Sequence, residues 1–169
     1  VHELRLFKSA QEINVMRHAA HATAAGHLRL MSELKPGLRE YHLEAELNYA
    51  FAGAGARTTA YPSIVGSGNN ANIMHYTQND DLIRSGDLVL VDAGAEYEGY
   101  AADVTRTLPA SGRYSEAQAD IYNVVLTAQL AAIAAVKPGN HWNQPHEAAV
   151  REITLGLIRL GLLQGEVNE

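Results

Sequence analysis

The sequence contains no cysteine, which excludes disulfide bonds and thiolate metal ligands. It has no apolar run long enough to cross a membrane, and no cluster of Lys or Arg offsets its net charge of -6. Nucleic acid and membranes are therefore not expected as partners. A metal ion would have to be held by Asp, Glu, His or water, and this donor set favours Mn²⁺, Mg²⁺ or Zn²⁺.

What is present is an ordinary composition for a globular protein of 169 residues, enough for one domain with a sizeable core. The start of the chain lacks a signal-peptide pattern. The first residue is Val rather than Met, however, so an upstream segment stays possible.

Two capping boxes predict the starts of long helices. Residues 9–12 read Ser-Ala-Gln-Glu and residues 115–118 read Ser-Glu-Ala-Gln, so that the first and fourth side chains can each accept a hydrogen bond from the other residue's backbone N–H. Lys-Pro-Gly at 35–37 and again at 137–139 ends these helices. After the first box, residues at helical spacing form one stripe: Ile13, Met16, Ala20, Ala24, Leu28 and Met31.

A second helix is expected after each Lys-Pro-Gly. The first covers about residues 40–52, and the other carries Val150, Ile153, Leu157 and Leu160 on one face. This order of elements predicts a duplicated α–α–β unit, with a first repeat at about 9–110 and the helical part of a second repeat at about 115–169. The second copy is expected to lack its strands. The alternative is coincidence, because Lys-Pro-Gly is a common helix terminator.

The β region of the first repeat has three predicted parts. Strand-like segments lie near 58–65 and 73–76, separated by Gly-Ser-Gly-Asn-Asn at 66–70. A hairpin follows, with strands at 88–91 and 101–108 and the polar connection Glu-Tyr-Glu-Gly at 96–99.

The hairpin carries two carboxylates, Asp92 and Asp103. A tight turn centred on Tyr97 and Glu98 would place them directly opposite each other, with Cβ atoms about 4.5–5.5 Å apart. Carboxylates at that spacing repel each other, and both could reach two divalent metal ions about 3.5–4 Å apart. The alternative is an exposed hairpin whose Asp residues face water. A one-residue slip would also separate them onto opposite faces, but the Val-rich approach to Asp92 favours a buried strand.

These residues together resemble a known family. Ile-Val-Gly-Ser-Gly at 64–68, His75-Tyr76, the run from Ser85 to Gly94, and Gly-Tyr-Ala-Ala-Asp-Val-Thr-Arg-Thr at 99–107 resemble the proline-specific aminopeptidases (aminopeptidase P, Xaa-Pro aminopeptidase) among the pita-bread metallopeptidases. Asp-Ala-Gly at 92–94 favours the proline-peptidase branch over methionine aminopeptidase. The resemblance covers nearly the whole chain. It implies an α+β fold of two α–α–β repeats, of which this chain would be an incomplete part.

The resemblance also implies a metal site with five ligands. Asp92 and Asp103 match the first two; Asp92 would bind one metal ion through both oxygens and Asp103 would bridge both ions. The family's remaining His and two Glu ligands would fall beyond Glu169, and the family's amino-terminal domain is expected to lie outside these residues too. The chain is therefore expected to be a truncated catalytic domain that by itself does not hold a complete dinuclear site.

Three further residues have roles implied by the resemblance. His75 matches a histidine that contacts the peptide substrate or shuttles protons, although a histidine in such a loop is more often structural. Tyr61 matches a tyrosine of the substrate pocket, with a core aromatic as the equal alternative. Thr105 shares a strand face with Asp103, so a supporting hydrogen bond to that carboxylate is expected.

The expected function of the intact protein is metal-dependent removal of an amino-terminal residue that precedes proline. The resemblance implies two divalent ions, with Mn²⁺ expected, a peptide substrate with proline in second position, a homo-oligomer and a cytoplasmic location. Alternatives are a non-catalytic pita-bread module that binds peptides or proteins, or another family member such as prolidase or methionine aminopeptidase. Loss of the hairpin carboxylates usually marks the non-catalytic modules, and both are present here.

Overall fold

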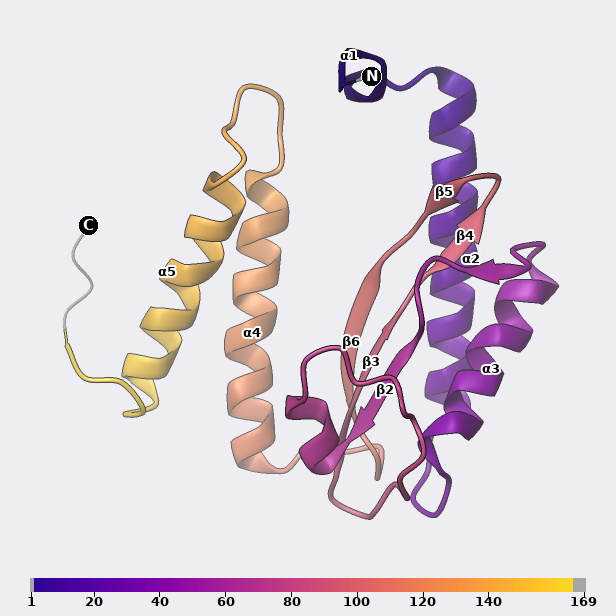
Figure 1. Ribbon diagram of the computed structural model, residues 1–169. Helices are drawn as coiled ribbons and strands as arrows, with labels where there is room; N and C mark the ends of the chain where they lie inside the picture. Colours follow the sequence, from indigo (N-terminus) through magenta and orange to yellow (C-terminus); the bar gives the residue numbers. More distant parts are fainter. Residues whose placement is uncertain (1, 166–169) are drawn as a thin grey trace. The chain divides into compact units, whose positions relative to one another are not determined.

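The computed structural model describes residues 2–165 and divides the chain into two compact units, Val1–Arg113 and Tyr114–Glu169 (Figure 1). Residues 166–169, which the predicted second repeat includes, lie outside the described residues. The first unit contains helices and strands and the second contains helices, so the predicted α+β class is confirmed.

The first unit begins with helices and continues into strands. Its elements are α1 (His2–Leu6), α2 (Ala10–Glu33), α3 (Glu40–Gly53), β1 (Thr58–Thr59), β2 (Ile64–Ser67), the 3-10 helix η1 (Gly68–Asn72), β3 (Leu88–Ala93), β4 (Ala95–Tyr97), β5 (Tyr100–Ala101) and β6 (Val104–Pro109). The strands form two antiparallel sheets with the orders β2-β3-β6 and β1-β4-β5. The second unit holds α4 (Glu116–Ala135) and α5 (Gln144–Arg159).

Both predicted capping boxes are confirmed. The Ser9 hydroxyl accepts from the Glu12 backbone N–H at 3.2 Å, and the Ser9 N–H donates to the Glu12 carboxylate at 2.7 Å. Ser115 and Gln118 repeat the arrangement at 3.3 and 2.9 Å. These bonds satisfy N–H groups that have no partner within the first helical turn.

The core of the first unit lies between α2, α3 and one face of the β2-β3-β6 sheet (Figure 1). Val89, Val91 and Ala93 alternate along β3 and are fully buried, as expected for the core-facing side of a strand. They pack in one cluster with helix side chains: Leu30, Leu43, Leu47 and Phe51. The stretch of β3 that leads to Asp92 is therefore buried on its helix side.

The buried face of α2 is not the predicted stripe. Small residues face the core, namely Ala19, Ala22, Thr23 and Gly26, together with His27 and Leu30. Ile13 and Leu28 of the predicted stripe are 38% and 66% exposed. A Cβ on Gly26 would lie 2.3 Å from the Phe51 ring. The helix therefore approaches α3 too closely for larger side chains on this face.

In the second unit, α4 and α5 pack against each other, and Gly156 lies against Val124. Large apolar side chains of both helices remain exposed in this unit, including Leu130 at 57% and Val150 at 47%. None of the described helices is long and apolar enough to cross a membrane.

The predicted strand at 73–76 is wrong. These residues form a turn after η1, with Ile73 and Met74 54% and 84% exposed. His75 has a φ of 54°, which is left-handed backbone that a strand cannot contain.

The predicted register of the hairpin is also wrong, by two residues. Tyr97 pairs with Tyr100, and Asp92 lies opposite Thr105 rather than Asp103. The two turn residues are Glu98 and Gly99, with φ of 47° and 83°, the sign at both positions that a type I′ turn requires. Because side chains alternate with a period of two, a shift of two residues leaves Asp92 and Asp103 on the same face.

The two arms of the hairpin approach each other closely at Gly94. A Cβ at this position would lie 1.7 Å from the Ala102 carbonyl oxygen, which only a glycine avoids without moving the strands apart. We expect Gly94→Ala to lower the free energy of unfolding by about 1–3 kcal/mol or more, measured by urea unfolding with circular dichroism. Gly53→Ala is the matched control, since a Cβ at Gly53 meets nothing within 4 Å; equal stability of the two variants would contradict the close approach.

Candidate metal centre

The hairpin presents both aspartates on the sheet face that points away from the helices. Val91 and Ala93 face the core, so Asp92 between them faces the opposite side. Asp103 lies in the short break between β5 and β6, two residues before Thr105, which pairs with Asp92. The predicted convergence of the two carboxylates therefore occurs, although through a diagonal rather than a direct pair.

Tyr61 joins the two carboxylates. Its hydroxyl lies 2.6 Å from Asp92 Oδ1 and 2.9 Å from Asp103 Oδ1. Since these distances add to 5.5 Å, the two carboxylate oxygens are no farther apart than that. The ring is half-buried and its hydroxyl contacts both aspartates, so Tyr61 lies beside the carboxylates and not in the hydrophobic cluster. Its place in a substrate pocket stays a prediction.

The electrostatics of this group are unbalanced. Burial, followed by the hydrogen bonds to Asp92 and Asp103, raises the pKa of Tyr61 above its ordinary value. The phenol is therefore protonated at neutral pH, but it has one hydrogen for two carboxylates. One of the two close contacts is thus left without a proton, and two negative charges remain together. A cation at this position would relieve the repulsion.

Helix α2 supports the hairpin from the core side. The Thr23 hydroxyl accepts from the Ala95 N–H at 2.9 Å, and His27 Nε2 donates to the Ala93 carbonyl at 3.2 Å. Burial lowers the pKa of His27, so it is neutral and carries its hydrogen on Nε2. These two bonds lie on either side of Gly94 and fix the backbone immediately after Asp92.

His75 lies outside the hydrogen bonds that join Tyr61 to the carboxylates in the described part of the chain. Its turn follows η1, whose backbone lies over Gly66: a Cβ on Gly66 would be 2.9 Å from the Asn70 carbonyl oxygen. Gly66 shares a strand face with Ile64, the cross-strand partner of Asp92. The segment that carries His75 therefore begins on the carboxylate side of the sheet.

The donor set fits divalent metal ions in part. Carboxylate oxygens are ligands that Mn²⁺, Mg²⁺ and Zn²⁺ accept, and Asp92 and Asp103 converge. Among residues 2–165, however, no group of three or more His, Cys, Asp or Glu side chains is arranged to hold a metal ion. The two aspartates would thus be one side of a metal centre.

Sequence reasoning missed several residues that position this hairpin. Thr23 and His27 could have been found from the small residues that recur at helical spacing along α2, a pattern typical of close helix packing. Glu40, a fully buried carboxylate, and Asn79, a buried amide, were also missed. No local pattern marks either one, because their partners are distant in the sequence.

The sequence matches a known protein family and several of its members. The sequence profile of metallopeptidase family M24 matches residues 14–165. The chain is 47% identical over its full length to Xaa-Pro aminopeptidase of Escherichia coli strain K12, and 36% identical over 98% of its length to Xaa-Pro dipeptidase of Mus musculus.

A solved structure shows the same fold. Aminopeptidase PepP of Pseudomonas aeruginosa aligns with 96% of this chain at 56% identity and a TM-score of 0.94. This confirms the predicted pita-bread resemblance. The chain spans 38% of the Escherichia coli aminopeptidase, 35% of the mouse dipeptidase and 37% of the Pseudomonas chain. With a family match that covers most of its residues, the chain belongs to metallopeptidase family M24.

Proposed function

We propose that the protein containing this chain is a metal-dependent aminopeptidase that removes an amino-terminal residue preceding proline. The observation that carries the proposal is the convergence of Asp92 and Asp103 on the Tyr61 hydroxyl, at 2.6 and 2.9 Å. It is supported by the 47% identity to a bacterial Xaa-Pro aminopeptidase. The proposal extends to a cytoplasmic homo-oligomer that uses Mn²⁺, as the family resemblance implies.

Each residue of the site has a defined part. Asp92 and Asp103 would hold divalent metal ions, which act as Lewis acids and activate water for attack on a peptide carbonyl. Tyr61, protonated at neutral pH, would orient the carboxylates by donating its single hydrogen to one of them while it contacts the other. His75, exposed on its turn, would donate a hydrogen bond to the peptide or exchange a proton with it. Thr105, opposite Asp92, would support the hairpin carboxylates; its hydrogen bond to Asp103 stays a prediction.

The second candidate is an Xaa-Pro dipeptidase, favoured by the 36% identity to the mouse enzyme. Both candidates require proline in second position and differ in the length of the peptide accepted. Parallel assays of an Xaa-Pro dipeptide and an Xaa-Pro-Xaa tripeptide would separate them. Preference for the tripeptide supports the aminopeptidase.

The aspartates can be tested in the full-length protein. We expect Asp103→Ala to lower hydrolysis of an Xaa-Pro-Xaa peptide by more than about 100-fold, because changing even residues that only support metal ligands commonly costs 10–100-fold. Bound metal, measured by elemental analysis, should fall in parallel. Asp120→Ala, which removes an exposed carboxylate from α4, is the control and should keep both. Activity near wild type in Asp103→Ala would overturn the site.

The printed 169-residue chain gives a separate prediction. With no group of three metal-ligating side chains among its described residues, it should bind Mn²⁺ weakly in calorimetry and should not hydrolyse an Xaa-Pro peptide. Zn²⁺ titrated in the same way tests whether the weak binding depends on the metal. Tight binding of two ions with turnover would mean that this chain alone supplies a complete centre.

A further inference from the structure

Residues 68–81 connect β2 to the segment before β3 and carry His75. After η1 ends at Asn72, the segment has no helix or strand. Ile73 and Met74 at its turn are exposed, and His75 has left-handed backbone. A turn with so little burial of its own needs other contacts to keep one conformation.

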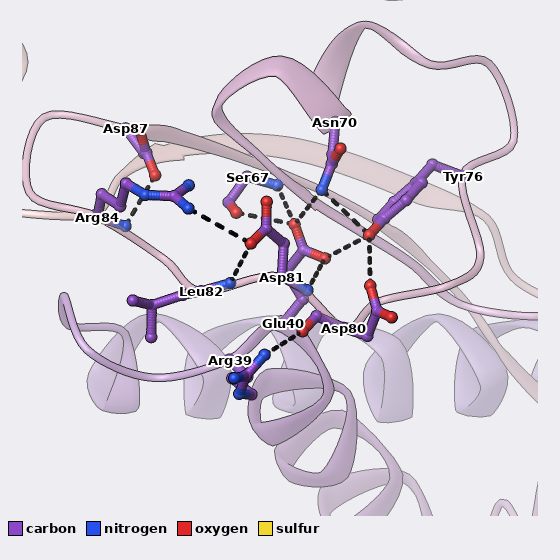
Figure 2. A network of polar contacts seen from close by, with 10 residues as sticks. All are labelled: Arg39, Glu40, Ser67, Asn70, Tyr76, Asp80, Asp81, Leu82, Arg84 and Asp87. Carbon is purple, nitrogen blue, oxygen red and sulfur yellow. Dashed lines mark hydrogen bonds and ion pairs between the residues drawn. The ribbon is translucent and has the colours of Figure 1, made fainter.

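Those contacts centre on Glu40, the first residue of α3, which is 0% exposed (Figure 2). Its Oε1 accepts from the Ser67 N–H at 2.7 Å, the Ser67 hydroxyl at 2.8 Å and Asn70 Nδ2 at 3.1 Å. Its Oε2 accepts from the Tyr76 hydroxyl at 2.7 Å and the Asp81 N–H at 3.0 Å. One carboxylate therefore contacts residues 68–81 near their start and at their end, and it also contacts Tyr76, the neighbour of His75.

The charge on Glu40 is stabilised by these neutral donors. Burial alone would raise the pKa of Glu40, but the hydrogen bonds from Ser67, Tyr76 and Asn70 outweigh it and hold the pKa below its ordinary value. The positive end of the α3 dipole acts in the same direction. The carboxylate is thus ionised at neutral pH, and hydrogen bonds to a charged acceptor are about twice as strong as neutral ones.

Asn79 holds the returning part of the same segment. Its Oδ1 accepts from the Val65 N–H at 2.9 Å, and its Nδ2 donates to the Ser63 carbonyl at 2.9 Å and to Glu44 Oε2 at 3.0 Å. The Ser67 N–H bonds to Glu40 in the same way. These contacts provide hydrogen-bond partners for backbone groups of alternate residues along the edge of β2 that faces away from β3. Two side chains therefore replace a neighbouring strand at this edge.

We infer that Glu40 is a positioning residue for the candidate site: it fixes residues 68–81 and so sets the position of His75. The inference rests on the proposed function, in which His75 contacts the peptide. Glu40 itself is fully buried, and the hydrogen bonds described for it go to Ser67, Asn70, Tyr76 and Asp81, away from Asp92 and Asp103. Its effect passes through Tyr76, which is covalently next to His75, and through Asn70 at the entry of the segment.

The test is Glu40→Gln in the full-length protein. Gln keeps the shape and can still accept from Ser67 through its oxygen. Its amide nitrogen, however, faces the Tyr76 hydroxyl and the Asp81 N–H, so both donors lose this acceptor. We expect amide hydrogen exchange within residues 70–77 to speed up at least about 10-fold, while exchange of Val89 and Val91 in β3 stays unchanged. We also expect kcat/KM for an Xaa-Pro-Xaa peptide to fall about 10–100-fold, the cost of misplacing a reacting group by roughly 1 Å.

Two further variants supply a control and a second test. Glu46→Gln removes a half-buried carboxylate of α3 that pairs with Arg29 of α2 and contacts none of residues 68–81, and should change neither readout. Tyr76→Phe removes a single donor next to His75 and should reproduce the faster exchange and part of the loss in kcat/KM. If Glu40→Gln fails to fold, Tyr76→Phe tests the inference in its place.

The His75→Ala background separates positioning from a general structural role. If Glu40 acts through His75, adding Glu40→Gln to His75→Ala causes little further loss of kcat/KM. An equal loss in both backgrounds, or unchanged exchange in residues 70–77, would overturn the inference. A wild-type protein that does not cleave Xaa-Pro peptides would instead overturn the proposed function and with it the role toward His75, and the exchange data would still decide whether Glu40 fixes the segment.

Discussion

Two negative charges that share one hydroxyl set the main constraint on this structure. Asp92 and Asp103 approach each other because the hairpin puts them on one face, and Tyr61 contacts both. The repulsion between them has to be resisted by the backbone that carries them. Helix α2 supplies that resistance through the bonds of Thr23 and His27 to the hairpin on either side of Gly94.

This support explains which face of α2 is buried. Thr23 and His27 reach the hairpin backbone because the helix lies close to its neighbours, and a Cβ on Gly26 would already clash with Phe51 at 2.3 Å. Larger side chains on this face would hold the helix away and lengthen both bonds. Apart from Leu30, which is buried, the larger apolar residues of α2 therefore lie toward the outer face, where Leu28 is 66% exposed. Close approach, rather than side-chain hydrophobicity, determines the orientation of the helix.

The sequence predicted what depends on local pattern. Capping boxes gave the helix starts, and the alternation of β3 put Asp92 opposite the core face. The register was wrong because the turn is centred on Glu98 and Gly99, both in left-handed backbone, and not on Tyr97 and Glu98. The strand at 73–76 was wrong because apolar residues there are exposed on a turn. The role of Glu40 could not be predicted, since its donors lie 27 to 41 residues away in the sequence.

Glu40 and the pair of hairpin aspartates differ in how many hydrogen-bond donors surround each negative charge. Glu40 has five hydrogen-bond donors for one charge, and its pKa is held low without a cation. Asp92 and Asp103 share the Tyr61 hydroxyl as a donor, in the described part of the chain, for two charges. A buried anion that is fully satisfied has no need of a ligand and holds its surroundings rigid. Asp92 and Asp103 converge beside a single shared hydroxyl, and a cation that joined them would relieve their repulsion. The count of donors per charge therefore distinguishes the structural carboxylate from the pair suited to metal.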